Sequence, residues 1–306
     1  MTRLRHSWTG FCRYMQVSNR RFFGFVEGKD SDRYFYGRLC ECVCTKLNVS
    51  YEIVIADQLS VAGSGGKQIL LDFFRYVRRI NFLNNEFQGK VTTALFFVDK
   101  DIDDIERKLL RSDHVVYTEH YQVENYLFIY GNLIDSAAAA AGLDRNLVLA
   151  RLGDLSTWRR SRAQLWSEWV KICVFVKSRR VRGTANYGIT SPLNDPPLSD
   201  TNQALFMHML GDIETASGFS ARTFLNAFRR TSAFVNNLFA RGEHDRIFKG
   251  KWYGVLIDSE LRQVAAGLPY DNQHVAHRLL TALAVTLDYE GSWADHFKRQ
   301  IGQLLA

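Results

Sequence analysis

Apolar and polar positions form a regular rhythm in the first half of the chain. The continuous apolar run at 22–26 is typical of a strand that is covered on both faces. Further runs predict strands at 51–55, 93–98 and 114–117, and amphipathic stretches between them predict helices at about 31–47, 67–82 and 103–110. Strands that alternate with helices imply parallel crossovers, so we expect an α/β fold, Rossmann-like, with helices on both sides of a parallel sheet.

The pattern changes after Tyr126. Residues 131–152 are alanine-rich and helical in pattern, and 158–177 read as an amphipathic basic helix. Three of the four prolines lie in 179–200, which is therefore expected to be a loop. From 201 to 306 nearly everything reads as helix, apart from a short segment at 252–257. We expect two domains, an α/β domain at 1–130 and a mostly α-helical domain at 131–306.

Composition is that of a folded chain with a substantial core. The 306 residues are 46% hydrophobic and 23% charged, and the length suits two domains. No apolar run approaches the roughly 18 to 20 residues that a membrane span needs. Residues 1–15 lack the apolar stretch of a secretory signal. We therefore expect a cytoplasmic protein without membrane association, in which the five cysteines stay reduced.

Three of those cysteines form a C-x-C-x-C run on a predicted helix. Helical spacing puts Cys40 and Cys44 on one face and Cys42 on another. No histidine or second cysteine pair lies nearby to complete a tetrahedral metal shell. The pattern favours buried or half-buried thiols over a metal site. His274 and His277 are likewise interpreted as ordinary helix residues.

The formal net charge of +7 is concentrated in one segment. Residues 158–183 hold eight basic side chains and one acid, Glu168, while the rest of the chain is balanced. Guanidinium groups bind phosphates, and the interleaved Trp158, Trp166 and Trp169 offer stacking faces, so a nucleic-acid contact is favoured. The alternative is a solvated helix face whose tryptophans lie in the core. The candidate contacts are Arg159, Arg160, Arg162, Lys177, Arg179, Arg180 and Arg182.

Acidic residues follow two of the predicted strands. Glu27 comes directly after the first strand, and Asp99, Asp101 and Asp103 come directly after the third. In an open parallel sheet, ligands bind at the carboxyl ends of the strands. Carboxylates that converge there repel one another unless a cation lies between them, and oxygen ligands suit Mg²⁺ or Mn²⁺. Such an ion activates water or stabilises the charge of a reacting phosphodiester.

Three rival motifs fail at specific positions. An EF-hand that begins at Asp99 needs glycine and glutamate where Asp104 and Leu110 stand. A phosphate-binding loop that ends at Gly66-Lys67 needs glycine at 61 and serine or threonine at 68, where the chain has Val61 and Gln68. A haloacid-dehalogenase motif needs threonine or valine at 103. A phosphatase or phosphotransferase on the same sheet stays open as a weaker alternative.

The motifs resemble a known family. The segment F-V-E-G-K-D-S-D at 25–32, the glycine turn at 63–66 and F-V-D-K-D at 97–101 are similar to a toprim domain. Within that family, the E-G-x-x-x-D-x-x-F-Y spacing from Glu27 and Y-Q-V-E-N-Y-L at 121–127 resemble the branch of overcoming-lysogenization-defect (OLD) nucleases that includes effectors of bacterial anti-phage defence. The resemblance covers about residues 20–130. F-K-G-K-W at 248–252 also looks like the C-terminal Gly-Lys element of this branch.

The resemblance implies a role for each matched residue. Glu27 matches a metal ligand or general acid/base, and Asp99 and Asp101 match the metal-binding D-x-D. The further matches are Asp103 as an alternate metal ligand, Asp32 and Glu124 as acidic positions for a second metal, and Lys251 as a catalytic group that stabilises negative charge in the transition state.

The same resemblance implies a function. It points to a Mg²⁺-dependent (or Mn²⁺-dependent) nuclease that acts as the toxic effector of an anti-phage system, with tRNA or another RNA as its substrate. It implies an ATPase partner of the ABC/OLD type, and a homodimer is compatible with the helical C-terminal half. Two alternatives stay open: an OLD-type DNA nuclease, and a non-catalytic toprim-like subunit that binds nucleic acid or the ATPase.

Overall fold

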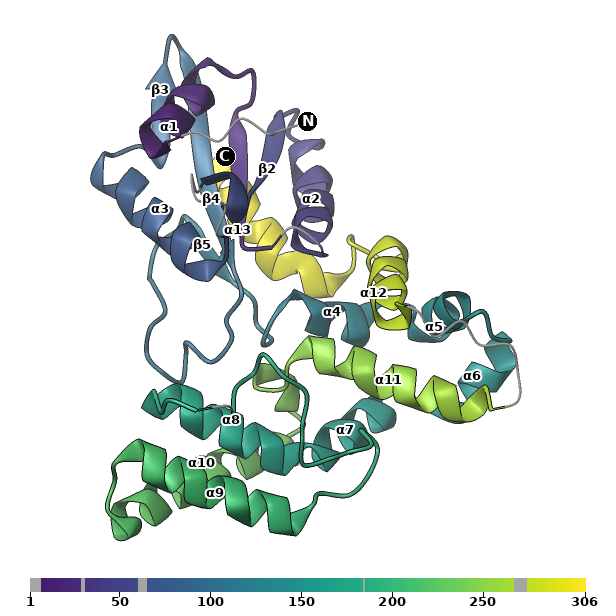
Figure 1. Cartoon of the computed structure of the whole chain (residues 1–306). Helices are drawn as coiled ribbons and strands as arrows, with labels where there is room; N and C mark the ends of the chain where they lie inside the picture. Colours follow the sequence, from purple (N-terminus) through teal and green to yellow (C-terminus); the bar gives the residue numbers. More distant parts are fainter. Residues whose placement is uncertain (1–6, 29–30, 60–64, 184, 267–273) are drawn as a thin grey trace. The chain divides into compact units, whose positions relative to one another are not determined.

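The computed structural model describes residues 7–28, 31–59, 65–183, 185–266 and 274–306 (Figure 1). Backbone contacts divide the chain into two compact units. The sheet unit comprises Met1–Lys100, Leu109–Thr118 and Asp288–Ala306, and the helical unit comprises Asp101–Lys108 and Glu119–Leu287. Both units are discontinuous in sequence, whereas the predicted domains are the contiguous segments 1–130 and 131–306.

The sheet unit is an α/β structure, as predicted. Its parallel strands are β1 (Phe22–Val26), β2 (Tyr51–Ile55), β4 (Lys90–Val98) and β5 (Val115–Tyr117). β1 pairs with β2 on one side and with β4 on the other, and β5 pairs with β4. All five residues of β1 are buried, which agrees with its continuous apolar sequence.

One strand was not predicted. β3 (Asn84–Phe87) runs antiparallel to β4 and makes the sheet mixed. Gln88 and Gly89 between them both have positive φ, 52° and 73°, as a tight two-residue hairpin requires. The sequence N-N-E-F is polar and only partly buried, so its hydrophobic pattern carries little strand signal.

Helices cover both faces of the sheet. On one face, α1 (Trp8–Val17) and α3 (Lys67–Arg79) share a core with Phe25 and Phe96 (Figure 1). Side chains alternate along a strand, so Phe97 points to the other face. There its ring stacks on Tyr36 of α2 (Ser31–Cys44), with centroids 4.3 Å apart. α2 and α3 end three residues before the predicted bounds of 47 and 82.

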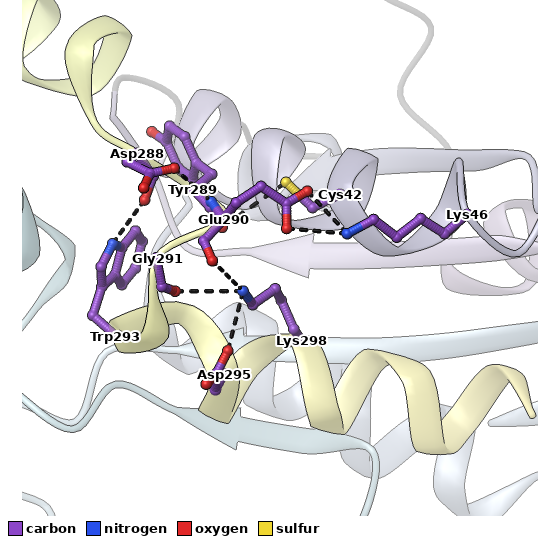
Figure 2. Close-up of polar contacts among 9 residues, drawn as sticks. All are labelled: Cys42, Lys46, Asp288, Tyr289, Glu290, Gly291, Trp293, Asp295 and Lys298. Carbon is purple, nitrogen blue, oxygen red and sulfur yellow. Dashed lines mark hydrogen bonds and ion pairs between the residues drawn. The ribbon is translucent and has the colours of Figure 1, made fainter.

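The end of the chain completes this second face. α13 (Asp295–Leu305) buries Phe297 against Phe35 and Tyr36 of α2, at centroid distances of 6.1 and 5.8 Å. Figure 2 shows the polar contacts of the preceding segment, in which the Glu290 carboxylate accepts from Lys46 Nζ at 3.0 Å. The prediction placed all of 201–306 with the helical region, but 288–306 packs within the sheet unit.

The cysteine run has the burial that its spacing predicts. Cys40 and Cys44 are buried on the inner side of α2, and Cys42 is half-buried with its thiol directed to the Tyr289 carbonyl at 3.9 Å. Burial raises the pKa of the Cys44 thiol to about 12. These thiols are therefore protonated at neutral pH.

The helical unit confirms the expectation of a helical C-terminal region. Its helices are α4 (Val123–Tyr130), α5 (Leu133–Ala141), α6 (Arg145–Leu152), α7 (Leu155–Leu165), α8 (Ser167–Arg179), α9 (Gln203–Ser217), α10 (Ala221–Ala240), α11 (Gly250–Val264) and α12 (Val275–Thr286). None of the helices in the described ranges is long and apolar enough to cross a membrane.

Several predicted elements are wrong in detail. Residues 103–107 form turns and 108–110 have no regular structure, where a helix was predicted, and 252–257 lie inside α11. The stretch 131–152 is two helices separated at Gly142, which adopts the left-handed conformation with φ 65°. The stretch 158–177 is also divided, because α7 ends at Leu165 and α8 begins at Ser167.

We predict that Phe297→Ala destabilises the sheet unit by about 3–5 kcal/mol, because it removes a fully buried ring from the face formed by α2 and α13. Arg299→Ala is the matched control, since Arg299 is exposed on the same helix and its loss is expected to cost at most about 0.5 kcal/mol. The measurement is urea unfolding followed by circular dichroism. Equal midpoints for the two variants would contradict the assignment of α13 to the core.

Candidate functional site

Two predicted acidic residues meet at the carboxyl edge of the sheet. Glu27 follows β1 and Asp99 follows β4, and these strands are parallel neighbours with Phe25 opposite Phe96. The Glu27 carboxylate accepts a hydrogen bond from the Asp99 backbone N–H, with 2.9 Å between Oε1 and N. Lys67, the first residue of α3, donates to the Asp99 carbonyl from its Nζ. Sequence reasoning did not identify Lys67.

Asp32 belongs to the same unit and secures the turn after β1. It lies in the first turn of α2, is 8% exposed, and accepts from the Gly28 backbone N–H at 2.7 Å. A Cβ at Gly28 would stand 2.9 Å from the same Asp32 oxygen, so glycine suits this close approach. Lys29 and Asp30 of the motif lie outside the described residues, as do Gly63 and Ser64 of the glycine turn. The role of Asp32 as a metal ligand stays a prediction.

Backbone hydrogen bonds fix the D-x-D segment at Lys100 and Asp101. Lys100 is 9% exposed, and its backbone N–H donates to the Thr118 hydroxyl at 2.8 Å. In the helical unit, the Asp101 N–H donates to the Tyr121 carbonyl at 2.8 Å, and Asp101 has a φ of 52°. A non-glycine residue in this left-handed region is uncommon and is typical of constrained positions.

Asp101 has a cationic neighbour in the helical unit. Its Oδ2 lies 3.3 Å from Nζ of Lys177, which the sequence placed among the nucleic-acid contacts. That ammonium also lies over the rings of Tyr121 and Tyr187, 5.7 and 5.6 Å from their centroids. The centroids of the two rings are 4.8 Å apart, so both rings lie beside the same ammonium group. Lys177, 33% exposed at its side chain, is therefore held beside Asp101 by this ion pair and by the two rings.

The motif at 121–127 and the motif at 248–252 form one cluster. Glu124, 3% exposed, lies 3.4 Å from Nζ of Lys251. The Asn125 side chain donates to the Phe248 carbonyl at 2.9 Å and to Asp245 at 3.2 Å. The structure thus brings the segment 121–127 and the segment 248–252 into contact, which the resemblance did not require.

Lys249 in that cluster was missed by sequence reasoning. Its Nζ donates to the Tyr187 carbonyl at 2.8 Å. Burial and the positive charge of Lys251 lower the pKa of Lys249, against the opposing effect of Glu124 and Asp101. Its only sequence signal was its place in F-K-G-K-W.

The predicted site residues therefore fall into two sets. The sheet unit holds Glu27, Asp32 and Asp99, and the helical unit holds Asp101, Asp103, Glu124 and Lys251. Asp103 is 9% exposed and lies in the turn after the D-x-D. Within the described ranges, no three histidine, cysteine, aspartate or glutamate side chains are grouped so as to hold a metal ion. The donors of both sets are carboxylate oxygens, the type that Mg²⁺ takes, so their chemistry fits the implied ion.

The basic segment differs from its predicted form. Trp158, Trp166 and Trp169 are 4%, 0% and 0% exposed, so they are core residues and offer no stacking faces. The amphipathic pattern could not distinguish buried tryptophans from exposed ones, because an indole ring suits both a core and a stacking surface. The interpretation of these tryptophans as base-stacking groups is wrong.

The candidate cations of this segment also divide. Arg162 lies 2.6 Å from the fully buried Glu260, and Arg159 lies 3.8 Å from Asp245 and donates to the Phe128 carbonyl at 3.3 Å. Those guanidinium groups stabilise buried carboxylates. The candidates that remain exposed are Arg160, Arg179, Arg180 and Arg182.

Comparison with known proteins adds no family assignment. Neither the protein-family models nor the curated proteins contain a match to this chain. The toprim resemblance therefore rests on the motif residues.

We predict that Gly250→Ala destabilises the helical unit by about 1–3 kcal/mol. A Cβ at Gly250 would lie 2.5 Å from the Asn125 backbone N and 2.7 Å from the Glu124 backbone carbon, and backbone atoms cannot move aside as a flexible side chain does. Gly211→Ala in α9 is the control, because a Cβ there meets open space and is expected to stabilise by up to about 1 kcal/mol. Chemical unfolding checks both variants. A stabilised Gly250→Ala would show that α11 does not need this close approach.

We predict that His244 makes the protein less stable in acid. The ring is 3% exposed, and burial lowers its pKa below the ordinary 6.5. Below pH 6.5 the unfolded chain therefore binds a proton at His244 more readily than the folded chain does. The free energy of unfolding then falls as the pH falls. From pH 7.5 to 5.5, wild type should lose more stability than His244→Gln, by at most about 1.4 kcal/mol, measured by urea unfolding. An equal fall in the free energy of unfolding of both proteins would show that His244 does not cause the acid sensitivity.

Proposed function

We propose that this protein is a Mg²⁺-dependent (or Mn²⁺-dependent) nuclease of the toprim type, acting through Glu27, Asp99 and Asp101. One observation carries the proposal: Glu27 and Asp99 stand at the ends of adjacent parallel strands, joined by the hydrogen bond from the Asp99 N–H to the Glu27 carboxylate. Ligands of open α/β sheets bind at such strand ends. The motif residues on both sides of this bond are those that resemble toprim nucleases.

The chain's own residues have separate tasks in this proposal. Glu27 and the D-x-D acids would supply carboxylate oxygens to the ion, and the contacts of Lys67 and Thr118 hold the D-x-D backbone in position. The bound ion would supply an activated water and neutralise phosphodiester charge. Lys251, 54% exposed at its side chain and ion-paired with Glu124, would stabilise negative charge on the substrate.

The biological role is proposed from the resemblance. Within the OLD-like branch, the motif residues resemble AriB, the toprim effector of the two-gene PARIS anti-phage system. We therefore propose a toxic effector that cleaves tRNA or another RNA after release from an ABC/OLD-type ATPase. A homodimer and a cytoplasmic location belong to the same proposal.

The test is cleavage of total tRNA, plasmid DNA and single-stranded DNA, each with Mg²⁺ or with EDTA. Wild type should produce discrete tRNA fragments only with Mg²⁺. Glu27→Gln keeps the side-chain shape and removes the charge, so it should lower the cleavage rate by on the order of 100-fold. Glu86→Gln is the control, because Glu86 is an exposed carboxylate on β3.

The outcomes separate the alternatives. Cleavage of DNA but not of RNA would support the nuclease proposal and show that the substrate is DNA. Cleavage by Glu27→Gln at the wild-type rate would contradict the toprim assignment. Nucleic-acid binding that survives EDTA, with no cleavage even in the complex with a co-purified ATPase, would favour the non-catalytic subunit.

A further inference from the structure

The helical unit contains two adjoining hollows that none of the predicted acidic site residues lines. The first, of about 330 Å³, lies among α8, α10 and the turn at 105–107, and its lining includes Arg107, Arg179 and Arg230. The second, also about 330 Å³, shares Arg179 and Arg230 with the first and extends toward Phe219. The shared arginines make the two hollows one continuous basic groove, which we call the arginine groove.

The charges of this groove are not neutralised within the unit. Arg107, Arg179 and Arg230 are exposed, and none of them has an ion pair with a carboxylate in the described part of the chain. Arg162 and Arg246 of the same unit are by contrast paired with Glu260 and Asp104. One acid, Glu106, lines the first hollow, but its carboxylate lies 2.5 Å from Nζ of Lys108. The groove is therefore complementary to an anion.

Aromatic faces lie beside these charges. Phe234 lines the first hollow and Phe219 the second, and they are 36% and 37% exposed. Across the described ranges, neither ring pairs with another aromatic ring, unlike Phe224 and Phe228 of α10, whose centroids are 6.0 Å apart. Arginines for phosphates combined with open aromatic rings for bases are the usual means of binding a single strand of nucleic acid.

We propose that the arginine groove binds single-stranded nucleic acid, with phosphates on Arg107, Arg179 and Arg230 and bases against Phe219 and Phe234. This inference deepens the proposed function and rests on it for the choice of RNA as the ligand. It moves the contact away from most of the basic segment 158–183, of which only Arg179 takes part. It also assigns the stacking role to phenylalanines, since the tryptophans are buried.

The experiment measures binding without cleavage. Fluorescein-labelled single-stranded RNA of 15 nucleotides is titrated with the full chain in EDTA and followed by anisotropy. Arg230→Glu should raise Kd by about tenfold or more and reduce the steepness of the salt dependence. Arg229→Glu is the matched control, because it makes the same charge change one residue away on α10 at an exposed position that lines neither hollow. Its Kd should stay within about twofold of wild type.

A second variant tests the aromatic part. Phe234→Ala should raise Kd by roughly fivefold, the lower end of what a stacked base contributes. Uridine monophosphate and inorganic polyphosphate are added as competitors. If the monophosphate competes at a concentration near that of the RNA, the ligand of the groove is a free nucleotide rather than a strand, and the proposal is wrong. If polyphosphate competes as well as the RNA does, base stacking is contradicted.

The remaining outcomes separate this inference from the proposed function. Equal loss of affinity in Arg229→Glu and Arg230→Glu, or no binding by wild type, would overturn the arginine groove. RNA cleavage with an unchanged KM in Arg230→Glu would overturn it as well and leave the nuclease intact. Binding that depends on Arg230 but not Arg229, with no cleavage under any condition, would support the groove and contradict the nuclease.

Discussion

The parallel register of β1 against β4 is the constraint on which the candidate site depends. Phe25 lies opposite Phe96, and their rings stack with centroids 4.7 Å apart in the core under α1 and α3. A slip of one residue would turn every side chain of a strand to the other face, so this aromatic layer keeps the pairing in register. The register in turn sets Glu27 beside the backbone of Asp99. The acidic pair is thus a consequence of packing several residues earlier in each strand.

The path of the chain gives the D-x-D an unusual place. Lys100 is the last residue of the first segment of the sheet unit, and Asp101 is the first residue of the helical unit. Asp99 is bonded through its backbone to Glu27 and Lys67, whereas Asp101 is bonded to Tyr121 and Lys177. The two acids of this three-residue motif are therefore constrained by different elements. Such a division is the reason that the neighbours of Asp101 could not be found from the strand pattern.

The arginines of the helical unit are of two kinds, those that pair with buried carboxylates and those that do not. Glu260 is fully buried and has Arg151 and Arg162 as ion-pair partners. A buried carboxylate is costly unless it is paired and hydrogen-bonded, so these arginines serve the core. The positive field of the unit then comes from arginines without such partners, and two of those, Arg107 and Arg230, lie far from the basic segment in sequence. A count of charges along the chain cannot distinguish these two kinds of arginine.

The local sequence by itself determined the four parallel strands, the helices that follow β1 and precede β4, and the position of Glu27 and Asp99 at strand ends. These follow from periodicity within one element, because a side chain's burial repeats with the pitch of its own strand or helix. Tertiary structure alone decided that residues 288–306 join the sheet unit, that a polar β3 pairs with β4, and that three tryptophans are buried. It also brought Lys177 to Asp101 and Lys251 to Glu124. The β3–β4 pairing joins residues three to nine positions apart in two different segments, and the other outcomes depend on contacts between residues tens to hundreds of positions apart. The energy of contacts between segments is not encoded in the period of any single segment.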